Sequence, residues 1–261
     1  MISAIEQIGR VALRISSSVG GTLSLAARVL LRMFEKRSYN SASRTVLINQ
    51  IYFTSVQILP LFLFVAVIFG VMVNGMVFQL IKKIGQTDYL GRLLMGFVVT
   101  EISPFVTVLL IALRSSSAIN AEIAVMKVNR EIRTLEFFNI DLIAYLFVPR
   151  VLNGILSMVF LSSLFSLVFL SIGLFVSIVI FGTSVDAYID TLLRSASLSD
   201  MIIVWFKCAA FGFFITLIPI ILGMNASQEL TSIPVAVLNG MVKVFSAIII
   251  IEVLSSIVRF I

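Results

Sequence analysis

The sequence predicts an all-α integral membrane protein with about five transmembrane helices, and two observations carry this prediction. Hydrophobic residues make up 60% of the 261 residues and charged residues only 12%, whereas roughly a quarter of a soluble domain is charged. The apolar stretches are also long and continuous, unlike the alternating segments of about ten residues in an outer-membrane barrel. The mean hydropathy of +1.14 agrees with a helical membrane bundle.

Composition also excludes several kinds of site. The chain has no histidine and one cysteine, Cys208, which argues against a zinc or haem site and excludes an intrachain disulfide. No G-x-x-x-x-G-K-[ST] motif occurs, so the chain lacks this phosphate-binding loop. We therefore expect no cofactor in this chain, and any ATP would be bound by another subunit. The net charge of +6 reflects membrane topology, and no nucleic-acid partner is expected.

The first 44 residues form a basic amphipathic segment. Apolar residues recur at helical spacing near the start, Gly20-Gly21 interrupts the pattern, and a second stretch reads "LSLAARVLLRMF". We predict that 1–44 lies on the cytoplasmic face of the membrane as an interfacial amphipathic helix; a solvated arm is the alternative. The basic residues are Arg10, Arg14, Arg28, Arg32, Lys36, Arg37 and Arg44, against Glu6 and Glu35.

Five apolar intervals predict the spans of one membrane domain that covers residues 1–261. A spanning helix needs about 20 residues, so the first and third intervals are long for single helices. Pro60 is a candidate kink in the first, and whether each is a single helix stays open. The predicted spans are 45–81, 93–113, 150–183, 201–224 and 236–258.

Charge distribution predicts the orientation of these spans. The N-terminal excess of basic residues places the N-terminus in the cytoplasm and, with five spans, the C-terminus outside. Residues 114–150, with five basic residues, then lie inside, and residues 183–200, with three Asp and one Arg, lie outside.

Two ionisable residues lie within predicted spans, where a charge is costly and usually faces a cavity or a partner. Glu101 lies nine residues after Arg92, and Lys207 lies seven after Asp200. At about 1.5 Å per residue their depths are roughly 13 and 10 Å below the outer surface. We predict that they pair, either to lock helices together or as a polar feature of a lipid cavity. Glu252, in the last span, receives no role.

Residues 120–141 are far more polar than their surroundings and predict an amphipathic helix between two spans. Ala124, Val128, Ile132 and Leu135 share one face of a helical wheel, together with Val125 and Phe138. Periodicity leaves two interpretations open: a helix lying at the interface, or a docking helix for a partner that supplies energy. The charged residues of the segment are Glu122, Lys127, Arg130, Glu131, Arg133, Glu136 and Asp141.

Residues 101–150 resemble the MlaE/YrbE family of ABC-transporter permeases. Family members show Arg-Glu-x-Gly-Pro, Gly-Arg-x-Gly-Ser-Ala, Ala-Glu, Met-(Arg/Lys), Leu-Glu, Asp-Pro and Pro-Arg in this order. Here Thr100 replaces the first arginine and Leu142 the proline after Asp141. The matching residues are Glu101 and Pro104, Arg114 with Ser117 and Ala118, Ala121-Glu122, Met126-Lys127, Leu135-Glu136, Asp141 and Pro149-Arg150.

The resemblance implies a multi-pass permease of the bacterial inner membrane that is not itself an enzyme. Such permeases are homodimers that move phospholipids between the inner and outer membranes. Each cytoplasmic coupling helix docks on an ABC ATPase, which binds ATP and Mg. A hexameric MCE-domain lipid-binding protein lies on the periplasmic side, and some systems add a small STAS-domain protein. The charged residues of 120–141 would then be the ATPase-coupling residues, and Glu101 and Lys207 would lie in the substrate cavity.

Two other functional classes are considered. A self-contained secondary transporter driven by ions would use Glu101 as its intramembrane carboxylate, although no inverted repeat is recognisable. A lipid-modifying membrane enzyme is disfavoured, because the chain lacks a Ser/His/Asp set and the commonest general base.

Overall fold

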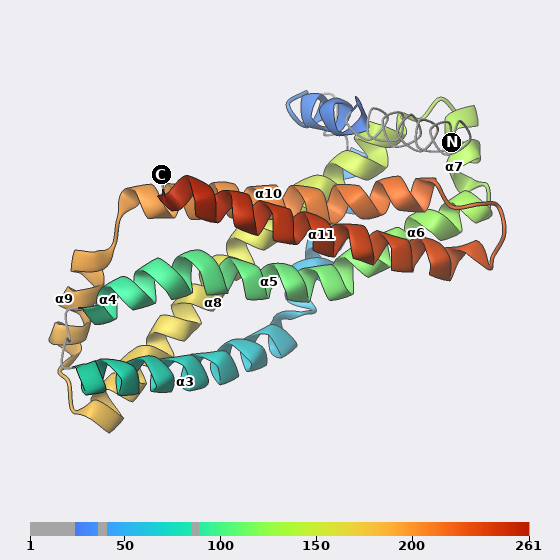
Figure 1. Ribbon diagram of the computed structural model, residues 1–261. Helices are drawn as coiled ribbons and strands as arrows, with labels where there is room; N and C mark the ends of the chain where they lie inside the picture. Colours follow the sequence, from blue (N-terminus) through green and yellow to red (C-terminus); the bar gives the residue numbers. More distant parts are fainter. Residues whose placement is uncertain (1–23, 36–40, 85–88, 261) are drawn as a thin grey trace, which may run out of the picture.

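The computed structural model describes residues 24–35, 41–84 and 89–260, and these residues form helices without a strand (Figure 1). A first helix covers 24–33. The further α-helices are α2 (Ser41–Ile51), α3 (Leu59–Ile84), α4 (Tyr89–Leu93), α5 (Ser103–Ile111), α6 (Ser117–Val128), α7 (Glu131–Phe137), α8 (Val148–Phe181), α9 (Val185–Ser195), α10 (Leu198–Met224) and α11 (Ser232–Phe260). Four π-helical segments join some of them: η2 (Tyr52–Val56), η3 (Leu94–Ile102), η4 (Ala112–Ser116) and η5 (Ile143–Phe147).

Five helical stretches of the described chain are long and apolar enough to cross a membrane, which confirms the predicted all-α membrane fold. Each long apolar interval is a single stretch, and the first is irregular at η2, just before Pro60. The second extends well past the predicted end at residue 113, because α6 continues it. The five stretches are Ser43–Ile81, Leu90–Val128, Ile143–Ile180, Leu198–Met224 and Ser232–Arg259.

Helix α10 is the centre of the bundle. It packs against α8, α11 and α6, and α8 in turn packs against α3. Figure 1 shows α10 and α11 side by side, α8 crossing them obliquely, and α6, α7 and the 24–33 helix gathered at one end. At the other end α9 connects α8 to α10 and lies beside α4.

Two glycines allow α8 and α10 to approach closely. A Cβ atom at Gly212 would lie 2.5 Å from the carbonyl oxygen of Gly154, and a Cβ at Gly154 would lie 2.3 Å from Cγ2 of Thr216. In lipid there is no hydrophobic force between helices, so close packing through small residues is a main source of helix association. This crossing therefore fixes the central helix against its largest neighbour.

Prolines in two spans free carbonyl groups that side chains of neighbouring helices satisfy. Pro104 has no N–H for the carbonyl of Thr100, and Lys207 Nζ donates to that oxygen at 3.3 Å. Pro219 likewise frees the carbonyl of Ile215, to which Ser116 Oγ donates at 2.6 Å. Because an unpaired backbone group costs several kcal/mol in hydrocarbon, each proline creates a specific link between two helices.

The N-terminal helix is tied to the bundle at the end where α7 lies. Val29 is fully buried in an apolar cluster that includes Ile132 and Leu146, while Leu31 is exposed. Arg32 lies 3.3 Å from a carboxylate oxygen of Asp141. This part of the predicted amphipathic segment is helical with one buried side. Residues 41–44, the end of the predicted segment, instead begin α2, which leads into the first candidate span. Residues 1–23 and 36–40, where the rest of that prediction falls, lie outside the described residues.

The α8–α10 crossing predicts a large effect of a small substitution. Gly212→Val should destabilise the protein by about 1–3 kcal/mol or more, because the added atoms meet the backbone of α8 rather than a flexible side chain. Thermal unfolding of the purified chain in detergent measures this. Gly75→Val in α3 is the matched control, since a Cβ at Gly75 meets nothing among the described residues within 4 Å. Equal unfolding temperatures of both variants would contradict the packing described.

Candidate functional site

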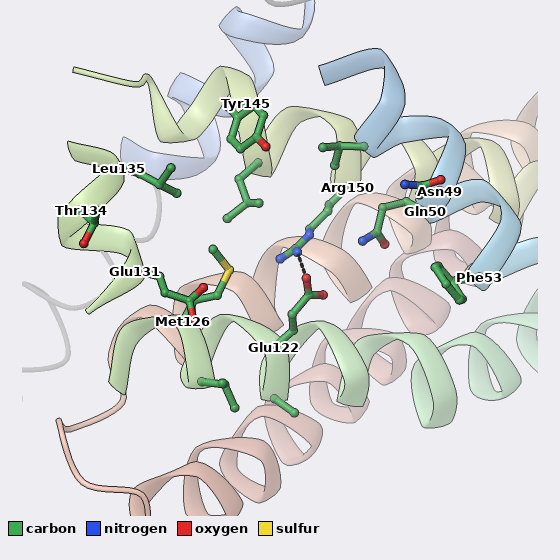
Figure 2. Close-up of a pocket in the computed structure, with 14 residues that line it drawn as sticks. Asn49, Gln50, Phe53, Glu122, Met126, Glu131, Thr134, Leu135, Tyr145 and Arg150 are labelled. Atoms are coloured by element: carbon green, nitrogen blue, oxygen red, sulfur yellow. Dashed lines mark hydrogen bonds and ion pairs between the residues drawn. The ribbon is translucent and has the colours of Figure 1, made fainter. Parts of the chain in front are cut away.

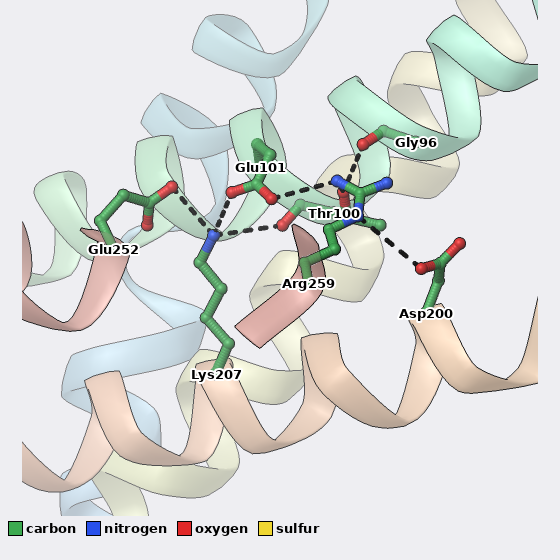
Figure 3. Close-up of polar contacts among 7 residues, drawn as sticks. All are labelled: Gly96, Thr100, Glu101, Asp200, Lys207, Glu252 and Arg259. Carbon is green, nitrogen blue, oxygen red and sulfur yellow. Dashed lines mark hydrogen bonds and ion pairs between the residues drawn. The ribbon is translucent and has the colours of Figure 1, made fainter. Parts of the chain in front are cut away.

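The predicted pair of intramembrane charges is present, and it belongs to a larger cluster (Figure 3). Lys207 Nζ of α10 lies 2.5 Å from Glu101 Oε2 of η3 and 2.9 Å from Glu252 Oε1 of α11. The Lys207 side chain is 1% exposed, and those of Glu101 and Glu252 are 19% and 23% exposed. One ammonium group thus joins carboxylates from the second and fifth spans.

Arg259, near the end of α11, closes the cluster on the side of Glu101. Its Nη1 donates to Thr100 Oγ1 at 2.5 Å and to Glu101 Oε1 at 3.1 Å, and its Nε lies 3.7 Å from Asp200 Oδ1. The guanidinium therefore contacts position 100, where the motif discussed above has an arginine and this chain has threonine. A cation at this place is supplied by the last span rather than by the second.

The π-helical segment η3 sets the direction of Glu101. A π-helical turn inserts an extra residue relative to an α-helix and rotates the residues that follow it; here Ser103 N donates to Val98 O, five residues back. Thr100 Oγ1 donates to Gly96 O at 2.5 Å, which leaves its oxygen as the acceptor for Arg259. Local backbone geometry thus presents both polar residues to α10 and α11.

Three carboxylates (Asp200, Glu101 and Glu252) meet two cations (Lys207 and Arg259), so the cluster has a formal charge of −1. Neutralisation is necessary because isolated ions in a low-dielectric medium cost several kcal/mol each. The side chains of Glu101 and Asp200 are 19% and 33% exposed, which allows the cluster to meet a polar group from outside the bundle. Within the described ranges, no group of three or more Cys, Asp or Glu residues could hold a metal ion.

Sequence reasoning found Glu101 and Lys207 but not the whole cluster. Glu252 was left without a role, although it lies in the last span near the end predicted to be external, at a depth similar to that of the pair. The predicted span ends at residue 258, and Arg259 lies just beyond that end. The only sequence signal for these two was their charge close to one membrane surface.

The predicted single amphipathic helix in 120–141 is wrong, because the chain turns at Arg130. Arg130 has φ 61° and ψ 15°, in the left-handed region, and it separates α6 from α7. The helical-wheel face that joined Ala124 to Phe138 therefore does not exist. Phe138 is 70% exposed instead of packing with the apolar face.

Six exposed residues at the turn, on α7 and directly after it are called the coupling surface, after the role that the family resemblance implies for this segment: Arg130, Glu131, Arg133, Glu136, Phe137 and Phe138. The two phenylalanine rings contact each other edge to face, with centroids 6.3 Å apart, and Phe137 is 83% exposed. Buried Ile132 holds α7 against the bundle. The surface thus combines an exposed aromatic pair with charges of both signs.

Three other predicted coupling residues lie outside this surface. Glu122 Oε1 accepts a hydrogen bond from Nη2 of buried Arg150 at 2.5 Å. Lys127 is half-buried near the end of α6. Asp141 Oδ1 accepts from the backbone N–H of Ile143 at 3.0 Å and so caps the helix that begins there. Sequence position grouped these residues with Arg133. The turn at Arg130 separates Glu122 and Lys127 from it, while Asp141 lies past the end of α7, beyond Asn139 with φ 55°.

Comparison with known proteins gives a consistent set of relatives. The family described as Permease MlaE matches residues 47–258. A probable ABC transporter permease protein ycf63 of Porphyra purpurea is 26% identical over 209 residues, which cover 80% of this chain and 78% of the relative. The intermembrane phospholipid transport system permease protein MlaE of Haemophilus influenzae is 31% identical over 120 residues, 46% of either protein. A probable ABC transporter permease protein of Synechocystis sp. is 31% identical over 134 residues, 51% of either protein.

The cluster predicts a large loss of stability when its central cation is removed. Lys207→Met leaves Glu252 without the cation that it contacts, and breaking a buried ion pair costs about 3–5 kcal/mol. The additional change Glu252→Gln should restore part of this loss. Thermal unfolding in detergent measures both effects, and Lys243→Met, an exposed lysine of α11, is the control.

Exchange of the charges of Glu101 and Lys207 should not restore stability, because a cation at 101 faces Arg259 and a carboxylate at 207 faces Glu252. If the charge exchange restored stability, the five-residue cluster would be contradicted. A Lys207→Met variant as stable as the Lys243→Met control would also contradict it.

Proposed function

The chain belongs to the MlaE permease family, and on this premise we propose that it moves phospholipids between the inner and outer membranes as the permease of an ABC transporter. A separate ABC ATPase, which binds ATP and Mg, would dock on the coupling surface and drive the movement. The permease itself performs no catalysis in this proposal.

The continuous helical stretch Leu90–Val128 carries this proposal. It contains Glu101 near one end and joins the coupling surface, through the turn at Arg130, at the other. Glu101 and Val128 are 27 residues apart, so roughly 40 Å of helix connects them. A displacement of α7 by a partner would therefore be transmitted along one element to the charge cluster.

The phospholipid substrate is inferred from two observations. The Haemophilus influenzae relative is named for intermembrane phospholipid transport. The charge cluster also offers partly exposed carboxylates beside cations, which suits a charged head group at the membrane surface.

We further propose the assembly that the family resemblance implies: a homodimer in a bacterial inner membrane, with the N-terminus cytoplasmic and the C-terminus periplasmic. An MCE-domain hexamer would bind on the periplasmic side, and a STAS-domain protein in some systems.

An ion-driven transporter that uses Glu101 is less well supported. Oε2 of Glu101 contacts Lys207 and Oε1 contacts Arg259, so a transported cation would have to displace two fixed cations. Family membership also points to a partner ATPase rather than to an ion gradient.

The aromatic pair of the coupling surface should dominate ATPase docking. The double variant Phe137→Ser/Phe138→Ser is expected to weaken association by about 2 kcal/mol or more, as for other exposed aromatic hot spots. ATP hydrolysis by the assembled complex and retention of the ATPase in gel filtration measure this loss. Arg133→Glu should have a smaller effect in the same direction, because rim charges contribute less than aromatic anchors.

Leu198→Ser is the matched control, because Leu198 is 81% exposed. It is the first residue of α10 and follows α9, which lies at the end of the bundle opposite α7. Wild-type ATPase retention in the double phenylalanine variant, with the control also unchanged, would exclude α7 as the docking element.

A further inference from the structure

A cavity of about 900 Å³ lies at the α7 end of the bundle, apart from the charge cluster (Figure 2). Its walls come from α2, η2, α6, α7, η5 and the first turn of α8. Two candidate membrane spans, Ser43–Ile81 and Ile143–Ile180, begin beside it. The cavity therefore adjoins the ends from which two candidate spans enter the membrane.

A buried arginine points into this cavity. Arg150 is 1% exposed, and its Nη2 donates to Glu122 Oε1. Its Nε and Nη1 have no hydrogen-bond partner among the described residues, although they carry three of the five N–H donors of the guanidinium. Since a buried charged donor without an acceptor is costly, the site favours a ligand that brings an anionic oxygen.

The other charges of the cavity define the ligand further. Glu122, whose side chain is 52% exposed, and Glu131 both line it. A simple anion would bind Arg150 but would be repelled by two carboxylates. A ligand with one anionic and one cationic group would match the cavity better. Its anion would bind Arg150, and its cation would lie beside the two carboxylates.

The remaining walls suit the apolar and the uncharged polar parts of an amphiphilic ligand. Phe53, Val125 and Met126 supply apolar surface, while Asn49 and Gln50 supply amide groups beside Arg150 (Figure 2). Phe53, in η2, is 57% exposed. The cavity thus offers a polar region beside apolar walls, and its volume lies in the range of small-molecule sites.

We propose that this cavity binds the head group of a zwitterionic phospholipid with a primary amine, such as phosphatidylethanolamine. The phosphate accepts hydrogen bonds from Arg150, whose unpaired nitrogens are buried and reach the ligand when the guanidinium turns toward the cavity. The ammonium donates to Glu122 and Glu131. This site is separate from the charge cluster, and it does not require that the lipid bound there be transported.

The test is native mass spectrometry of the full-length chain in detergent, titrated separately with phosphatidylethanolamine, phosphatidylcholine and phosphatidylglycerol of identical acyl chains. Phosphatidylethanolamine should bind about tenfold more tightly than the other two lipids at one site, because each charge-assisted hydrogen bond contributes at least that factor. The choline head group of phosphatidylcholine lacks N–H donors, and the glycerol head group of phosphatidylglycerol lacks the cation. Equal binding of the three lipids would overturn the proposal.

Val125→Trp fills the cavity without removing the Arg150–Glu122 pair, so it should abolish this preference in a folded protein. Val179→Trp, at an exposed position near the far end of α8, is the control. Glu131→Gln should reduce the preference for the primary amine while retaining phosphate binding. If Val125→Trp kept the lipid preference but lost ATPase binding in the assembled complex, the cavity would be a protein-docking pocket and the proposal would be wrong.

Discussion

The buried ammonium group of Lys207 is the constraint on which the arrangement of the second, fourth and fifth spans depends. A cation in hydrocarbon must replace its lost hydration with fixed partners, and Lys207 finds Glu101, Glu252 and the carbonyl of Thr100 within 3.3 Å. These groups come from two other spans. Because hydrophobic packing does not distinguish helix from lipid, such polar contacts determine which faces of the spans meet.

The same constraint explains how irregular backbone is accommodated inside the bundle. Pro104 and Pro219 each remove a backbone donor, and side chains of neighbouring spans replace it. The irregular segments therefore become contacts between helices rather than weak points. The stretch Leu90–Val128 keeps its continuity through two π-helical segments, and this continuity is what connects the charge cluster to α7.

The number of spans and the pairing of Glu101 with Lys207 followed from hydropathy, length and depth, which are one-dimensional properties. Glu252 and Arg259 were missed as partners of Glu101 and Lys207 because an ion pair also depends on the direction in which each side chain leaves its helix. At Glu101 the π-helical segment η3 changes that direction. The break at Arg130 was missed because periodicity assumes an unbroken helix, and arginine seldom adopts a left-handed conformation. The separation of Glu122 from the coupling surface follows from the same turn, and its ion pair with Arg150 of the next span could not be read from periodicity.

We propose that this permease is driven by a partner rather than by an ion gradient. The most direct measurement is purification of the C-terminally tagged chain from its native membrane in mild detergent, with cross-linking, followed by mass spectrometry of the proteins that accompany it. We expect an ABC ATPase in comparable amount, cross-linked to α7. A chain that is recovered alone after cross-linking would contradict a partner-driven permease and would make Glu101 a candidate ion site.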